Sequence, residues 1–185
     1  MTNVQPWEER RKAARVTAAR DELLEQGKLF VFDGGSDERT RAVSVITEII
    51  RRHREGPLKI WDVYFSGDDL LSVFQGLSDS SLPIRILSNE KKRPTNDALT
   101  NARPPSLDEA TDALGNEGMK AGVSVDVEHR RGESFHDRFL ITDSTCWQLG
   151  SSFNHIGSRF TTILEFPHPD LVIRAFDQAW KAAGS

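Results

Sequence analysis

Short apolar runs alternate with amphipathic segments along the first part of the chain. Apolar runs typical of buried strands lie at residues 28–35, 58–65 and 84–88. Segments with apolar residues at helical spacing lie at residues 36–54 and 68–77, and a third begins near Ser106. Strands that alternate with helices predict an α/β fold, with helices packed on both faces of one sheet.

The pattern changes after Gly122. Segments with strand character then follow one another without a helix between them, at residues 123–129, 139–143, 146–150 and 160–166. Strands joined by short turns run antiparallel, whereas strands joined through helices run parallel, so the sheet is predicted to be mixed. Residues 168–183 return to helical spacing and predict a last helix.

Two segments stand outside this alternation. Residues 6–27 begin at a proline, end at a glycine and have only a thin apolar side, which predicts a peripheral N-terminal helix. Residues 89–105 are polar and contain prolines and basic residues, which predicts a long loop. We therefore expect a peripheral helix at residues 1–27 and one domain at residues 28–185.

Composition agrees with one folded domain. The 185 residues are 37% hydrophobic and 28% charged, with a formal net charge of -4, so a disordered chain is excluded. Nothing in these values requires a nucleic-acid or membrane partner. Basic residues nevertheless cluster in the first helix and at residues 91–93, where they would form local basic faces.

The cellular setting follows from cysteine content and from the first residues. The sequence has one cysteine, Cys146, which cannot form an intramolecular disulfide. Its first twenty or so residues are polar and charged, unlike a secretory signal. No apolar run approaches the roughly 18 residues that a membrane span needs. We expect a reducing, cytoplasmic setting and no membrane span.

Candidate chemistry lies in the stretch FHDRFLITDSTCWQLGSSFN. His136 and Arg138 are two residues apart in a predicted strand, so their side chains would project to the same side. An imidazole can attack phosphorus, and a guanidinium can bind two phosphate oxygens. The turn after the next strand would add backbone, hydroxyl and amide donors at Gly150, Ser151 and Asn154. These residue types in this order predict a site for a phosphate group.

The spacing His-x-Arg-x4-Asp-x6-Gly-Ser-x-x-Asn resembles the signature of the phospholipase D superfamily. The resemblance rests on His136, Asp143, Gly150, Ser151 and Asn154, and the order of predicted elements also fits one half-unit of that family. It implies a phospholipase D-like mixed sheet flanked by helices. The Asp-x-Tyr sequence at residues 62–64 fits bacterial members.

The resemblance implies a role for each matched residue. His136 would be the nucleophile that forms a phosphohistidine, and Asn154 would donate to a phosphate oxygen, with a further phosphate contact from Ser151. Asp143 and Gly150 would be structural. Glu165 sits where family members carry an acid that hydrogen-bonds the histidine, which would fix its tautomer.

Two departures from the signature leave two functions open. Arg138 replaces the family's lysine, which keeps the charge but changes its geometry. The motif occurs once, so a second catalytic histidine would come from another chain, most simply in a homodimer. One hypothesis is a metal-independent phosphodiesterase without a cofactor, acting on nucleic acid. The alternative is a binding module that holds phosphate groups, nucleic acid or a protein partner within a larger assembly.

The resemblance also suggests a biological setting and a precedent for the second hypothesis. The arginine form resembles a branch that includes C-terminal domains of MIT-domain trafficking proteins, whose members bind anionic partners without evident catalysis. Bacterial phospholipase D-like domains often occur in anti-phage defence systems.

Other kinds of site fit the sequence less well. A metal could be imagined at His129, Glu133, His136 and Asp137, but their spacing matches no helix-borne ligand pair, so no metal is expected. The glycine pair before Ser36 lacks the lysine of a phosphate-binding loop and is predicted to be a helix-capping turn.

Overall fold

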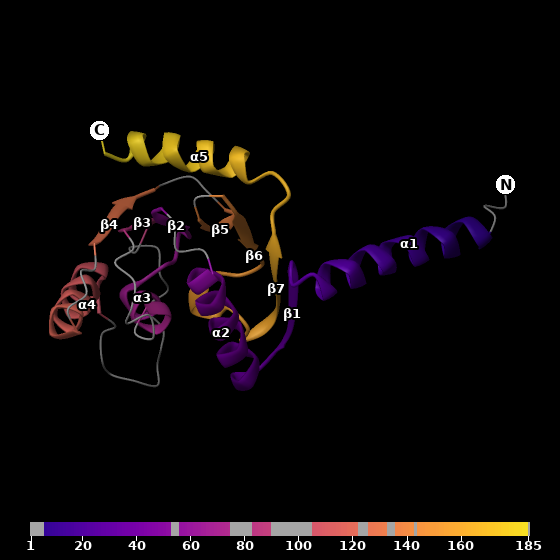
Figure 1. Cartoon of the computed structure of the whole chain (residues 1–185), viewed down its shortest axis with the longest axis horizontal. Helices are drawn as coiled ribbons and strands as arrows, with labels where there is room; N and C mark the ends of the chain where they lie inside the picture. The colour runs from indigo at the N-terminus through magenta and orange to yellow at the C-terminus, as the bar shows by residue number, and fades with distance from the viewer. Residues whose placement is uncertain are drawn as a thin grey trace.

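A computed structural model of the chain describes residues 6–52, 56–74, 83–89, 105–121, 126–132, 136–142 and 144–184. Its strands are β1 (Leu29–Gly34), β2 (Leu58–Trp61), β3 (Pro83–Ser88), β4 (Asp126–Arg131), β5 (Arg138–Ile141), β6 (Cys146–Leu149) and β7 (Arg159–Glu165). Its α-helices are α1 (Pro6–Glu25), α2 (Ser36–Arg52), α3 (Gly67–Phe74), α4 (Leu107–Ala121) and α5 (Pro169–Ala182) (Figure 1).

The strands form one mixed sheet in the order β1-β7-β6-β5-β2-β3-β4. β2, β3 and β4 are parallel, and the connections between them run through α3 and α4. β5, β6 and β7 are joined by short connections and are antiparallel, as is the pairing of β1 with β7 and of β5 with β2. The prediction of a mixed α/β sheet is confirmed.

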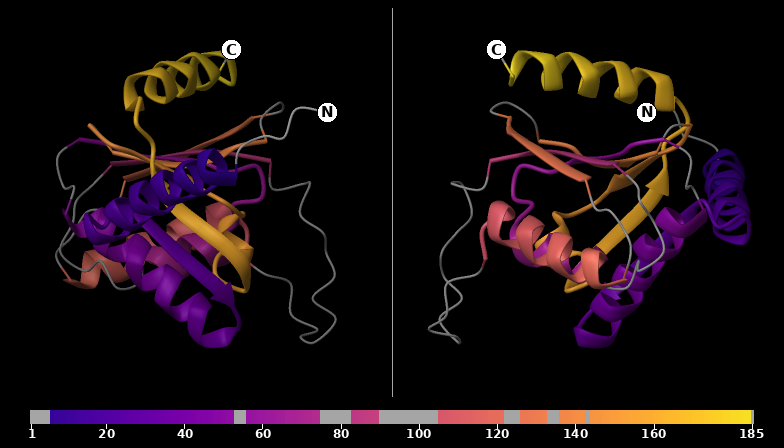
Figure 2. Two further views of the ribbon diagram at one scale, coloured as in Figure 1. Left: turned by 90° about the vertical axis from the view of Figure 1, so that its right-hand side faces the viewer. Right: turned by 60° about the vertical axis from the view of Figure 1, so that its left-hand side comes forward.

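Helices cover both faces of this sheet. Figure 2 shows α5 on one side and α2, α3 and α4 on the other. Alternate residues of β5 face opposite sides, because Leu140 packs in the core under α2 and α3 while Phe139 and Ile141 pack against Phe176 of α5. The prediction of helices on both faces is therefore confirmed.

The start of α4 is set by the local sequence. The amide of Glu109 donates to Ser106 Oγ at 3.1 Å, and the amide of Ser106 donates to Glu109 Oε2 at 2.7 Å. This reciprocal pair is a capping box, which satisfies two N–H groups at the start of a helix. The predicted helix start near Ser106 is confirmed.

Two strands are shorter than predicted. β2 ends at Trp61 and not near Phe65, because the next residue, Asp62, is fully buried and its oxygens accept hydrogen bonds from the amides of Tyr64 and Phe65. These bonds turn the chain out of the sheet. β5 begins at Arg138, so His136 precedes the strand and does not belong to it. The shared strand face predicted for His136 and Arg138 is not formed.

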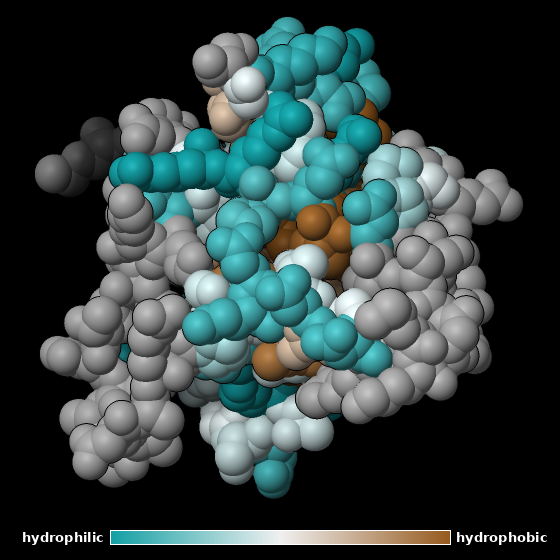
Figure 3. Space-filling model, turned by 90° about the vertical axis from the view of Figure 1, so that its left-hand side faces the viewer, coloured by the Kyte–Doolittle hydropathy of each residue, from teal (hydrophilic) through white to brown (hydrophobic). Residues whose placement is uncertain are grey.

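The surface is polar over much of the part that the structure describes. From the α4 side, most of the coloured surface is hydrophilic, and apolar residues show in small areas between the hydrophilic ones (Figure 3). The large apolar side chains that are exposed elsewhere are Trp7, Val16, Leu24, Phe160 and Leu171. Within the described ranges, no helix is both long enough and apolar enough to cross a membrane. Most of the predicted 89–105 loop, the start of the predicted 123–129 strand and Asp143 lie outside these ranges.

Candidate functional site

A cavity of about 440 Å³ opens where the carboxyl end of β2 meets the start of β5 and the end of β6. The residues that line it are Tyr64, Arg138, Gly150, Ser151, Ser152, Asn154, His155, Arg159 and Phe160. Carboxyl ends of parallel strands are a common place for ligand sites in α/β sheets. The structure thus brings together Arg138, Gly150, Ser151 and Asn154, which were predicted to form one site.

The guanidinium of Arg138 is held at its Nε nitrogen. Its Nε donates to Ser152 Oγ at 2.7 Å and lies 3.9 Å from Asp62 Oδ1. The guanidinium carbon lies 6.0 Å from the centre of the Tyr64 ring. The side chain is 26% exposed, and no partner among the described residues hydrogen-bonds its terminal nitrogens. The two terminal nitrogens are therefore free to bind an anion in the cavity.

Asp62 lies next to Arg138 and binds backbone amides on two sides of the cavity. It is fully buried, and its carboxylate accepts hydrogen bonds from the amides of Tyr64 at 2.9 Å and Phe153 at 2.8 Å. Burial raises the pKa of Asp62, and the two amide bonds and the nearby Arg138 oppose part of that rise. Since Phe153 follows β6, Asp62 joins the end of β2 to the turn that carries Asn154.

Asn154 lies in a short 3₁₀ helix at Phe153–His155. The guanidinium of Arg39 donates to the carbonyl oxygens of Phe153 at 3.2 Å and Asn154 at 2.9 Å, which holds this helix against α2. The side-chain Oδ1 of Asn154 is buried and has no hydrogen-bond partner among the residues that the structure describes. An unpaired buried amide is costly, and a ligand or water in the cavity is one way to satisfy it.

Gly150 and Ser151 form the turn that leaves β6. A Cβ added at Gly150 would lie 2.9 Å from Thr161 Oγ1 and 3.1 Å from the backbone nitrogen of Thr162, so the close contact with β7 requires a glycine. Ser151 Oγ accepts a hydrogen bond from Thr161 Oγ1 at 3.3 Å. Gly150 is therefore structural in this turn, and Ser151 reaches the cavity.

The rim of the cavity adds groups that sequence reasoning missed. Arg159 and Phe160 begin β7, and Phe160 is 70% exposed despite its large apolar ring. Arg159 is exposed and adds a second cation beside Arg138. The sequence signal for this rim was weak, because a single Arg-Phe pair at a strand start is common. For the site as a whole, Asp62 was a stronger sequence signal, because a charged residue within an apolar run marks the end of a strand.

His136 does not line the cavity. It is exposed and lies two residues before Arg138, next to residues 133–135, which the structure does not describe. No hydrogen bond to His136 is found within the described ranges. The histidine is thus near the cavity along the chain but is not part of its wall.

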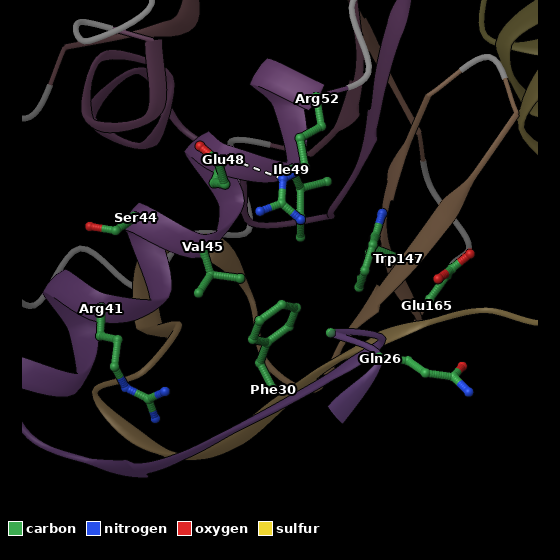
Figure 4. A pocket seen from close by; sticks show the side chains of 11 residues that line it. Gln26, Phe30, Arg41, Ser44, Val45, Glu48, Ile49, Arg52, Trp147 and Glu165 are labelled. Atoms are coloured by element: carbon green, nitrogen blue, oxygen red, sulfur yellow. Dashed lines mark hydrogen bonds and ion pairs between the residues drawn. The ribbon is translucent and has the colours of Figure 1, made fainter. Parts of the chain in front are cut away.

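Glu165 lies in a different place from the one predicted. Strand register aligns it with Trp147 and Leu140, whereas Arg138 aligns with Leu149 and Ile163. Glu165 is therefore roughly 7 Å along the strands and roughly 10 Å across them from Arg138. It borders a second cavity with Trp147 and Gln26 (Figure 4). The predicted hydrogen bond between Glu165 and His136 is not formed.

Other reactive groups are few in the part of the chain that the structure describes. No group of three or more His, Cys, Asp or Glu side chains is placed there to hold a metal ion. Cys146 is fully buried, and burial raises the pKa of its thiol to about 12, so it is not a nucleophile at neutral pH. The proposed structural role of Asp143 falls on a residue outside the described ranges.

Comparisons with known proteins identify no family for this chain. No family model matches the chain, and no curated protein matches it. Among solved structures, the chain is similar to TrmBL2, an archaeal chromatin protein whose structure is reported to show a novel mode of DNA binding. The TM-score is 0.48 at 16% identity, over 97% of this chain and 67% of that chain.

Proposed function

We propose that this chain is a phospholipase D-like module that binds the phosphate groups of single-stranded nucleic acid in the cavity around Arg138. The observation that carries this proposal is the geometry of Arg138. Its Nε is fixed by Ser152, the residue lines the cavity, and no described residue hydrogen-bonds its two terminal nitrogens. A guanidinium held in this way is ready to bind two phosphate oxygens.

The rest of the cavity supports an anionic ligand. Arg159 adds a second cation and Ser151 adds a hydroxyl that can donate to a phosphate oxygen. Asp62, the carboxylate that lies 3.9 Å from Arg138 Nε, is fully buried. The local charge is therefore positive although the whole chain carries a formal charge of -4.

The rim supports nucleic acid as the source of the phosphate. Phe160 exposes most of its ring at the cavity edge, and Tyr64 lies on the wall beside Arg138. Aromatic rings beside cations are typical of sites that bind single strands, where bases stack on the rings. A free phosphate ion has no apolar group that could contact the ring of Phe160.

A second candidate function is a phosphodiesterase that works through a phosphohistidine at His136. The exposure of His136, two residues before Arg138, favours it. The absence of His136 from the cavity wall and the position of Glu165 weigh against it. In this function a second chain would supply the other histidine, so it requires a homodimer. Membership of a larger assembly or of a defence system stays a prediction.

Binding is tested by titrating a fluorescently labelled single-stranded oligonucleotide and measuring anisotropy. We expect Arg138→Ala to weaken binding roughly 10-fold or more, because it removes hydrogen bonds from a cation to phosphate. Arg174→Ala is the matched control, since Arg174 is an exposed arginine on α5 that pairs with Asp170 on the same helix. Equal affinity of wild type and Arg138→Ala would contradict the proposal.

Cleavage is tested with the same oligonucleotide on a denaturing gel, in the presence of a metal chelator. A binding module leaves the oligonucleotide intact. If wild type cleaves and His136→Ala binds without cleaving, the phosphodiesterase is the correct function. If both proteins cleave equally, His136 is not the nucleophile and the second candidate fails.

A further inference from the structure

The wall of the cavity around Arg138 contains a histidine, and this histidine is His155, not His136. His155 is exposed and is the last residue of the 3₁₀ helix at Phe153–His155. No hydrogen bond to its ring is found within the part of the chain that the structure describes. An imidazole without a protein partner therefore borders the space in which the phosphate is proposed to bind.

The backbone of His155 is held in place on both sides. Its amide donates to the carbonyl oxygen of Ser152 at 2.9 Å, and its own carbonyl oxygen accepts a hydrogen bond from the amide of Ser158 at 3.0 Å. Arg39 of α2 binds the two carbonyl oxygens that precede it. Gly157 packs so closely on α2 that an added Cβ would lie 2.8 Å from Arg39 Cα. The side chain therefore starts from a fixed position at the cavity wall, and contact with a ligand requires no movement of the backbone.

His155 shares the cavity with two permanent cations, Arg138 and Arg159. A phosphate group between these side chains offers negative charge to all of them, so it favours a proton on an imidazole there. Linkage is reciprocal, so a proton on the imidazole strengthens phosphate binding by the same factor. A protonated imidazole also donates from both ring nitrogens, whereas a neutral one donates from a single nitrogen.

Carboxylates on the elements around His155 are engaged elsewhere or lie outside the cavity wall. Asp62 is fully buried and accepts hydrogen bonds from two backbone amides. Glu38 of α2 pairs with Arg41 at 2.8 Å. Asp33 of β1 and Asp137 before β5 are exposed, and neither lines the cavity. Among the residue types that line it, histidine is the one whose charge changes near neutral pH, because arginine and tyrosine do not titrate there.

We propose that His155 is a further phosphate-binding residue of this cavity and that its contact with phosphate depends on the proton it carries. With the proton, the imidazole adds a third cation and a charged hydrogen-bond donor beside Arg138 and Arg159. Without the proton, the two arginines hold the phosphate alone. Nucleic acid is therefore bound more tightly as pH falls. This inference rests on the proposed function, because it concerns the same cavity and the same ligand.

The test is an anisotropy titration with the labelled single-stranded oligonucleotide at about pH 5.5 and about pH 8, at constant ionic strength. The phosphodiester groups stay ionised at both values. Wild type is expected to bind roughly 10-fold more tightly at the lower pH, because a charged hydrogen bond to phosphate is added. His155→Gln cannot gain a charge, so it should lose this increase and match wild type at the higher pH. His155→Arg carries a permanent charge and should bind tightly at both values.

Matched variants separate His155 from other groups that titrate. His168→Gln is the control, since His168 is exposed at the start of α5, and it should keep the full increase of wild type. Asp62 is present in wild type and in both His155 variants, so any contribution from it cancels in their comparison. An increase that is lost in His136→Gln and kept in His155→Gln would assign the effect to the other histidine and overturn the inference.

The proposed function and this inference fail on different results. If Arg138→Ala weakens binding at both pH values but His155→Gln keeps the full increase, the cavity binds phosphate and the role of His155 is wrong. Weak binding of His155→Arg at the higher pH would also overturn that role. If wild type does not bind, or Arg138→Ala binds as well as wild type, the proposed function fails and the inference fails with it.

Discussion

Phe160 is the residue that separates nucleic acid from a simple anion as the ligand. Its ring is 70% exposed at the edge of the cavity, where packing does not account for it. If a base stacks on this ring, Phe160→Ala should weaken oligonucleotide binding by about 1–3 kcal/mol. The same variant should bind inorganic phosphate as wild type does, because phosphate makes no contact with the ring.

The measurement for Phe160 is a pair of titrations, one with oligonucleotide and one with inorganic phosphate. Leu171→Ala is the control, since Leu171 is a large exposed apolar residue on α5 away from the cavity. Loss of affinity for both ligands would mean that the ring shapes the cavity and does not stack. No loss for either ligand would remove Phe160 from the site.

Asp62 makes the stability of the fold depend on pH. Burial raises its pKa above the ordinary value of 3.8, so the folded state holds the proton more tightly than the unfolded state. The contribution of this group to stability is fully present below pH 3.8 and is lost as pH rises through the folded pKa. Asp62→Asn does not titrate and should lack this loss.

The check on Asp62 is urea unfolding of wild type and Asp62→Asn from acid to neutral pH. The free energy of unfolding of wild type, relative to the variant, should fall as pH rises. Asp170→Asn is the control, because Asp170 is exposed and pairs with the exposed Arg174 one turn along α5. A relative stability that rises with pH would mean that the amide bonds and Arg138 outweigh burial at Asp62.

At the scale of elements, α5 is the helix that covers one face of the sheet in the described part of the chain. Phe176 is fully buried there and packs edge-on against Trp61 with ring centres 5.9 Å apart, and Lys59 pairs with Asp177 at 2.7 Å. Phe176→Ala should lower the free energy of unfolding by about 3–5 kcal/mol, because it leaves a cavity under α5. Leu171→Ala, on the exposed side, should change it by about 0.5 kcal/mol or less.

Denaturant unfolding at neutral pH measures both α5 variants. A small change in Phe176→Ala would mean that α5 contributes little to stability and can detach from the sheet. A large change in Leu171→Ala would contradict the exposure of Leu171. Since Phe176 and Arg138 lie on opposite faces of the sheet, Phe176→Ala should leave oligonucleotide binding unchanged under folded conditions.

The elements themselves could largely be predicted from apolar spacing, because burial imposes that spacing on the sequence. The helix start at Ser106 could also be predicted, because a serine followed three residues later by a glutamate is a capping signal in the local sequence. The end of β2 was missed although Asp62, a charged residue in an apolar run, marks it, whereas the bond of Asp62 to the amide of Phe153, far along the sequence, could not be predicted. Leu171 is exposed although it is apolar, because α5 contacts the sheet along a narrower stripe than its apolar residues suggest.

At the scale of the whole molecule, the cavity is assembled from distant parts of the chain. The local motif placed Arg138, Gly150, Ser151 and Asn154 together, since they lie on adjacent strands and one turn. The position of Glu165 depends on strand register, which the sequence does not specify, so its assignment to this site failed. The wall at Tyr64 depends on pairing of β2 with β5 and was beyond local patterns.

The central claim is that phosphate binds in the cavity around Arg138, and its most direct test locates the ligand on the protein. Backbone amide signals are followed by NMR while a single-stranded dinucleotide is added. The account predicts that the largest shifts occur at Tyr64, Arg138, Ser151, Ser152 and Asn154, and that Arg138→Ala abolishes them. Shifts centred elsewhere, such as at the second cavity between α2 and β1, or shifts that persist in Arg138→Ala, would contradict it.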